Sequence, residues 1–237
     1  MKTFRKSSLI SSIALLLVAI VALSGATFAW FSTNNTATAG KLDMTATSAS
    51  GLFIVESDLA TVTAPTDGWS SKIEWTDVAE ALPAVSGTLN GTTSFFKTST
   101  DNADGTWNGE DEIQAAVVGT DYIAKKIWVK ADTTEEVTLT ITPTVAGTTK
   151  GYERVAIVDE NGNATIMDNS GAVYKAFSDQ AGTEEDVTPV NYGAVTFTGT
   201  FDTAKAYTVY CWFEGQDAQC KNVNSAANFT LDLAFAI

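Results

Sequence analysis

Residues 137–145 alternate between apolar residues and threonine, and this period of two residues limits the possible fold more than any other feature. Successive side chains of an extended chain point to opposite faces, so the stretch would have one apolar face and one hydroxyl face. The apolar set is Val137, Leu139 and Ile141, and the hydroxyl set is Thr138, Thr140 and Thr142. The pattern is typical of a half-buried β-strand.

Similar short runs follow one another after residue 40, separated by Gly, Asn, Asp and Thr, and none keeps a helical apolar period over three turns. The expected strands are residues 41–47, 52–55, 122–129, 137–145, 155–158, 164–167, 195–201, 207–213 and 229–237. The clearest hairpin signal is the turn at 159–163. Residues 78–82 and 172–177 fit either a short helix or a strand. We therefore expect an all-β protein, with residues 41–237 forming a single two-layered β-sandwich of jelly-roll type.

The first 29 residues have the three parts of an export signal. Three basic residues (Lys2, Arg5 and Lys6) precede an apolar run at 9–23, and small residues lead to Ala29. We expect residues 1–29 to be removed by cleavage between Ala29 and Trp30. The alternative is an uncleaved membrane anchor, because residues 7–29 are uncharged and long enough to span a bilayer.

The junction Ala29-Trp30-Phe31-Ser32 resembles that of the TasA/camelysin family of Gram-positive exported proteins. A dedicated signal peptidase, SipW, processes many members of that family. The resemblance covers residues 1–35, with Trp30 where Tyr or Phe is more usual and Thr33 where Asp or Asn is common. It implies secretion to the extracellular space, the cell surface or a biofilm matrix, and it implies fibre formation.

The charge of the chain restricts its partners. Cleavage after Ala29 would leave 208 of 237 residues and remove three of the 14 basic residues but no acidic one, so the net charge would change from −14 to −17. Such a body repels nucleic acids and anionic lipid headgroups, so we expect neither nucleic acid nor, after processing, a membrane as partner. Divalent cations are a candidate partner, although excess acid more commonly serves solubility.

The chain has no histidine, which excludes a Ser-His-Asp triad, a Cys-His pair and a His-based zinc site. The metalloprotease activity described for camelysin-type members therefore does not carry over. No glycine-rich phosphate loop or dinucleotide fingerprint occurs either. A carboxylate pair for glycoside hydrolysis remains conceivable, but 28 acidic residues form many meaningless pairs. We expect a protein that is not an enzyme and has no cofactor.

Cys211 and Cys220 are the only cysteines, and two cysteines in an exported protein usually pair. A disulfide closing so short a loop would stabilise the fold by about 2–3 kcal/mol. The alternative is two reduced thiols, one buried and one exposed.

Two further features have a structural and a binding interpretation. The acidic stretch 101–112 could bind calcium, but Ala103 and Gly105 stand where an EF-hand needs oxygen ligands, which favours a solvated turn. Trp69 and Trp107 lie in turn-like sequences where an exposed ring could stack on a sugar. Trp75, Trp128 and Trp212 lie in strand-like segments and are expected in the core.

These features favour a secreted structural subunit of an extracellular fibre or biofilm matrix. Residues 30–40, the arm, are uncharged and begin with two aromatic residues. An extended segment of this kind can add as a strand to the sheet of another copy or of a paralogue, with Trp30, Phe31, Ser32 and Thr33 leading. The arm could instead pair with its own sheet and leave a monomer. The second candidate function is a cell-surface binding module for a glycan or a host ligand.

Overall fold

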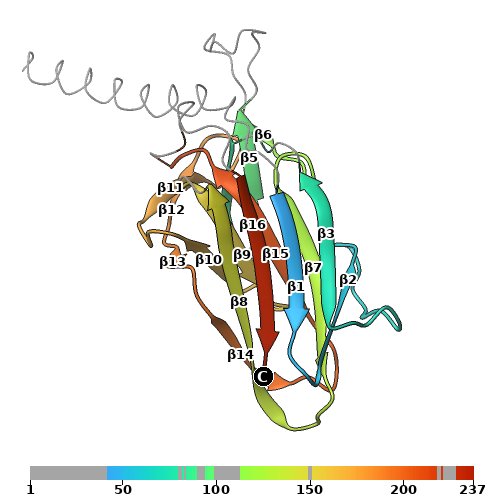
Figure 1. The fold of residues 1–237 in the computed structure, drawn as a ribbon. Coiled ribbons are helices and arrows are strands. Elements are labelled where there is room, and N and C mark those ends of the chain that lie inside the picture. The colour runs from blue at the N-terminus through green and yellow to red at the C-terminus, as the bar shows by residue number, and fades with distance from the viewer. Residues whose placement is uncertain are drawn as a thin grey trace, which may run out of the picture.

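The computed structural model describes residues 42–79, 82, 84–89, 94–98, 113–148, 151–217, 220 and 228–237. Every regular element in these residues is a strand, which confirms the all-β expectation. Two main sheets pack face to face as a sandwich (Figure 1). The jelly-roll topology and the domain boundaries at residues 29 and 40 stay predictions.

The first main sheet has five strands in the order β14-β8-β16-β1-β3. Their bounds are β14 (Val195–Thr200), β8 (Glu136–Thr148), β16 (Asn228–Ala236), β1 (Leu42–Ser48) and β3 (Lys72–Ala79). The first and last strands of the described chain, β1 and β16, lie side by side and parallel, and the other neighbours are antiparallel. Both ends of the described chain are therefore held inside one sheet.

The second main sheet is built around β15 (Lys205–Glu214), which pairs with β9 on one side and β7 on the other. The strands beyond these complete it. In order they are β13 (Val190–Asn191), β10 (Ala164–Asp168), β9 (Glu153–Val158), β15, β7 (Ile123–Ala131) and β2 (Leu52–Ser57). The end of β15 also pairs with a smaller set, β4 (Ala84–Thr88), β5 (Ser94–Thr98) and β6 (Ile113–Ala115). A separate hairpin joins β11 (Tyr174–Phe177) to β12 (Glu184–Val187).

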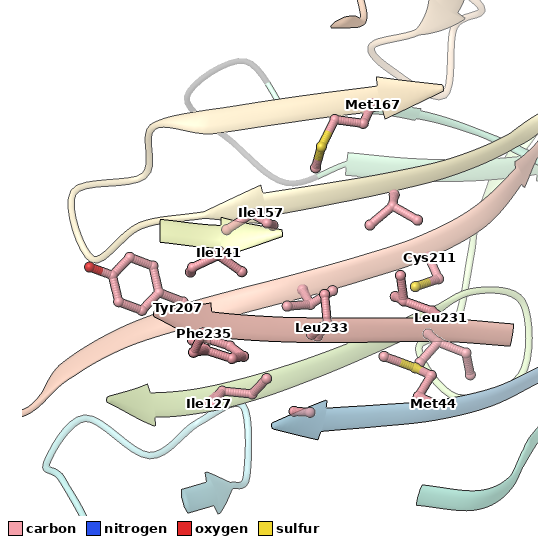
Figure 2. Close-up of a cluster of buried hydrophobic side chains, with 14 of the residues drawn as sticks. Met44, Ile127, Ile141, Ile157, Met167, Tyr207, Cys211, Leu231, Leu233 and Phe235 are labelled. Atoms are coloured by element: carbon pink, nitrogen blue, oxygen red, sulfur yellow. The ribbon is translucent and has the colours of Figure 1, made fainter. Parts of the chain in front are cut away.

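The apolar alternation of the sequence places one face of each central strand in the core. Leu231, Leu233 and Phe235 of β16 are buried and lie between the two sheets, together with Ile141 and Tyr207 (Figure 2). The hydroxyl face of β8 points outward, as the period of two predicts.

The last residue departs from the alternation. The alternation of residues 229–237 predicts that Ile237 shares the buried face of Leu231, Leu233 and Phe235, but Ile237 follows the end of β16 and is 48% exposed. The pairing of β16 with its described neighbours β1 and β8 ends at Phe235 and Ala236.

The outer face of the second sheet is also covered by packed side chains. Trp212 points to that face and packs with Phe95 of β5, whose ring stacks on Tyr122 at a centroid distance of 4.1 Å. Gly87 of β4 lies so close to Phe95 that a Cβ there would overlap the ring. A third layer, made of β4, β5 and the β11–β12 hairpin, thus buries both faces of β15.

The hairpin predicted around residues 159–163 is confirmed, with β9 and β10 antiparallel. Asp159 Oδ1 accepts hydrogen bonds from the backbone N–H groups of Asn161 and Asn163, both at 2.9 Å, and Gly162 takes a φ of +85°. Segments 78–82 and 172–177 fit either a helix or a strand by sequence. Their described strand residues are Val78 and Ala79, which end β3, and Tyr174–Phe177, which form β11.

Candidate assembly surface

Several of the predicted site residues lie outside the described residues. They are Ala29 and Trp30 of the cleavage junction, the leading arm residues Phe31, Ser32 and Thr33, and Trp107 with the acidic stretch 101–112. The structure instead describes the surface that an arm could meet. The first described strand begins at Leu42, directly after the arm.

β14 forms one edge of the five-stranded sheet and, among the described strands, pairs only with β8. Its inward side chains Val195 and Phe197 are half-buried against the core, and Thr196, Thr198 and Thr200 are exposed. The strand has six residues, none of them charged and none of them proline. Natural edge strands are usually protected by lysine, proline or a bulge, and β14 has none of these.

The opposite edge, β3, is protected. Lys72 and Glu74 form an exposed ion pair on it, and the register between β3 and β1 shifts between Leu42 and Met44. Charges and irregular pairing both disfavour the addition of another strand. Of the two edges of this sheet, β14 is therefore the one suited to pairing with another chain.

A hollow of about 250 Å³ lies beside the β14 edge, and we call it the Gly199 hollow. Phe197, Gly199, Phe201 and Tyr207 provide its apolar lining. Its polar lining comes from Asp159, Glu160, Asn161, Thr198 and Lys205. A Cβ added at Gly199 would meet no atom within 4 Å. The hollow is thus the empty place where the inward face of β14 lacks a side chain.

The first described residue, Leu42, lies far from this edge. Leu42 pairs with Phe229, which is opposite Gly147 near the end of β8, whereas β14 pairs with residues 136–141 at the start of β8 (Figure 1). The nearer end of β14 is six residues, or about 20 Å, away along the strands, and three strand spacings, or about 14 Å, away across them.

Cys211 and Cys220 are both free thiols, so the predicted disulfide is not formed in this structure. Of the two alternatives the structure has reduced thiols, but both are buried in the main core, which corrects the expectation that one is exposed. Burial raises the pKa of both thiols well above the usual range. Neither is therefore a reactive thiolate near neutral pH.

Sequence reasoning did not find a buried ion cluster around Arg154 of β9. The guanidinium is 1% exposed and donates to Asp217, to the carbonyls of Gly151 (2.9 Å) and Glu153 (3.1 Å), and lies 3.5 Å from Asp168. It also lies over the ring of Tyr174, at 4.7 Å. Burial alone would lower the pKa of Arg154. Tyr174 and the neighbouring carboxylates raise the pKa by more than burial lowers it, so the guanidinium stays charged.

Glu214, at the end of β15, belongs to the same region and is fully buried. Its Oε2 accepts from the backbone N–H of Gly87 (3.2 Å) and Nε1 of Trp212 (3.1 Å), and Oε1 accepts from the N–H of Gln216 (3.0 Å). Burial raises the pKa of this carboxyl to about 7. These bonds tie β4 of the third layer to the second sheet, so the carboxyl has a structural role.

The tryptophans give little support to a sugar site. The Nζ of Lys130 lies 4.1 Å from the ring centroid of Trp69. The indole N–H of Trp69 donates to the carbonyl of Pro65 at 3.1 Å. One ring face is therefore covered. The expected burial of Trp75, Trp128 and Trp212 is confirmed, with 7%, 7% and 0% exposed.

In the part of the chain that the structure describes, no cluster of three or more acidic or cysteine side chains is placed to hold a metal ion. The same residues contain no helix that could cross a membrane. No family model, curated protein or solved structure matches the chain.

Proposed function

We propose that the protein is a secreted structural subunit of an extracellular fibre or biofilm matrix, in which the arm of one copy adds as a strand to β14 of the next. The observation that carries this proposal is the unprotected β14 edge, with its adjoining hollow, on a sheet whose other edge is protected. Such an edge offers unpaired backbone N–H and C=O groups to an extended segment, and pockets beside it give specificity.

The arm is long enough to pair with the whole of β14. Eleven residues reach about 36–40 Å when fully extended, and pairing along all six residues of β14 would use about half of that reach. Residues 36–41 then connect the paired segment to Leu42 and span about 23–25 Å when extended, which is close to the separation of about 24 Å between Leu42 and the nearer end of β14, so pairing within one copy is the alternative. The arm and the receiving edge are also different surfaces, so the contact is head-to-tail and can continue into a filament.

The charge distribution also supports contact between the arm and β14. Each processed copy would carry −17, and close contact between two acidic surfaces would be unfavourable. The side chains of the arm and of β14 are all uncharged, and the arm's only charge is its α-ammonium group, so their contact brings no like charges together. Repulsion between the bodies is screened over about 8 Å at physiological salt, and salt or divalent cations should therefore speed assembly.

The test uses the mature chain beginning at Trp30, with electron microscopy and light scattering. We expect filaments from the full mature chain and none from a chain that lacks residues 30–36. N-terminal sequencing of the secreted protein establishes whether processing yields Trp30. If the mature chain stays monomeric at every pH and salt concentration and is retained on a polysaccharide, the binding-module function takes its place.

Lysine substitutions on β14 and on an interior strand provide a matched comparison. Thr196→Lys and Thr198→Lys each place an exposed lysine on β14, while Thr144→Lys adds the same charge on the interior strand β8. All three lower the negative charge equally, so a general electrostatic effect would speed assembly in each. We expect the two β14 variants to lose filaments and the β8 variant to keep them. Equal assembly by all three would exclude β14 as the receiving edge.

A further inference from the structure

We propose that the Gly199 hollow binds the indole of Trp30 from the neighbouring copy's arm. The inference rests on the proposed function and names the part of the receiving copy that fixes the position of the arm. The hollow lies on the core side of β14, next to the edge that an added strand would extend. It is part of the folded body, and the proposed occupant is a segment that precedes Leu42 in a second copy.

The register of β14 explains why the hollow exists. Inward positions along the strand alternate as Val195, Phe197 and Gly199, and the third provides no side chain. Phe201 and Tyr207 of β15 also line the space, and both are buried in the core, with 2% and 4% exposed. A strand added beside β14 would place one of its own inward side chains within about 4.5–5.5 Å of position 199.

The size and lining of the hollow suit an aromatic ring. The hollow has about 250 Å³, which is more than the roughly 150 Å³ of an enclosed apolar cavity that binds benzene, and it is open to solvent with both apolar and polar lining residues. Three of its lining residues are aromatic, and aromatic rings favour tilted or offset contacts with one another. An indole bound there would bury apolar area on both partners and would also shield the exposed side of Phe197.

The negative charge beside the hollow favours Trp30 over Phe31 as the residue that binds there. Processing gives Trp30 an α-ammonium group, and the turn beside the hollow carries Asp159 and Glu160 against one cation, Lys205, whose Nζ lies 2.7 Å from Glu160. Hydrogen bonds from the Asn163 side chain and from the Asn163 and Asn161 backbone outweigh burial and hold the pKa of Asp159 below its usual value. The rim therefore has a net negative charge that complements a free N-terminus. An unprocessed chain has no such group at Trp30.

Placing Trp30 at Gly199 also fixes the direction of the arm. A parallel arm would pass the end of β14 after one residue, because the strand ends at Thr200. An antiparallel arm follows β14 back to Val195, with Thr33 beside Thr196 on the outward face. The arm is therefore antiparallel to β14.

The deciding variant fills the hollow from within the receiving copy. Gly199 does not have a positive φ and its Cβ direction is open, so Gly199→Leu should fold with a melting temperature equal to or above that of the wild type. We expect its filament growth rate to fall at least tenfold. Thr144→Leu adds the same side chain on the outward face of the interior strand β8, away from the hollow, and should assemble at the wild-type rate. Trp30→Ala should fail like Gly199→Leu, whereas Trp30→Phe should keep part of the activity.

Mixing the chains distinguishes a blocked hollow from a misfolded protein. A folded Gly199→Leu copy can still donate its arm but cannot receive one, so one such copy in ten should limit filaments to roughly ten copies. A misfolded copy would not incorporate and would leave their length unchanged. Wild-type assembly by pure Gly199→Leu, or unchanged lengths in a mixture whose Gly199→Leu copy has the melting temperature of a folded chain, would overturn the role of the hollow and leave the fibre function standing. An absence of filaments from wild-type protein would overturn both.

Discussion

The ring of Phe197 on β14 lies against the ring of Tyr207 on β15, with a centroid distance of 4.7 Å and a tilt of 52°. This contact joins the edge of one sheet to the centre of the other. It also separates the main core from the Gly199 hollow, since both rings line that space. β14 is therefore held by packing between the sheets as well as by its pairing with β8.

The Phe197–Tyr207 contact should have a measurable coupling energy. We expect a double-mutant cycle with Phe197→Leu and Tyr207→Leu, followed by urea unfolding, to give about 0.5–1.5 kcal/mol, the usual range for a tilted aromatic pair. Pairing Tyr207→Leu with Thr198→Ala gives the control, because Thr198 points to the opposite face. Strict additivity of the Phe197 and Tyr207 effects would show that the rings do not stabilise each other.

Truncation of the C-terminal strand should be severe inside the core and mild beyond it. Phe235→Ala removes a ring that is 2% exposed and should lower the free energy of unfolding by about 3–5 kcal/mol. Ile237→Ala, two residues later and 48% exposed, should change it by less than about 1 kcal/mol. Urea denaturation of both variants gives the comparison. Equal losses would mean that β16 is not anchored as described.

Simple alternation predicted much of the fold correctly. The period of two in β8 and β16, and the Asx turn at Asp159, depend only on neighbouring residues and were readable from the sequence. The third layer was not readable, because it depends on contacts such as that of Phe95 with Trp212, which lie far apart in the chain.

The candidate site was readable only in part. A glycine inside a strand pattern often marks a close approach or a gap, so Gly199 was a signal that could have been followed. That β14 is an edge depends on which distant strands pair, and no local pattern encodes it. Arg154 was missed for a related reason: arginine is normally exposed, and its burial is possible only because β10 and the turn after β15 bring carboxylates to it.

The Arg154 cluster should be intolerant of losing its cation. Arg154→Ala would leave the buried Asp168 and the nearby Asp217 without the guanidinium, which should cost about 3–5 kcal/mol. Arg154→Lys should not restore stability, since one ammonium cannot reproduce the several bonds of the planar guanidinium. Lys175→Ala, which breaks an exposed pair with Asp186, should change stability by less than about 1 kcal/mol. A similar small effect for Arg154→Ala would contradict the buried cluster.

Glu214 should make the fold less stable as pH rises from about 5 to 7.5. Its folded pKa of about 7 lies above the ordinary value of 4.5, so between these values the folded state binds more protons than the unfolded state. The free energy of unfolding therefore falls with rising pH through this group. We expect Glu214→Gln to lose that part of the slope when urea midpoints are compared at pH 5 and 7.5. An unchanged slope would show that Glu214 titrates normally.

The most direct test of the central claim is a disulfide between two different chains. Thr33→Cys in one mature chain and Thr196→Cys in another should form an interchain bond on mixing and oxidation, while the native thiols remain buried and inert. Glu74→Cys on the opposite edge is the matched control. The account predicts rapid formation of the 33–196 heterodimer on a non-reducing gel and little with the Glu74 chain. Equal cross-linking to both edges, or none to β14, would contradict addition of the arm at β14.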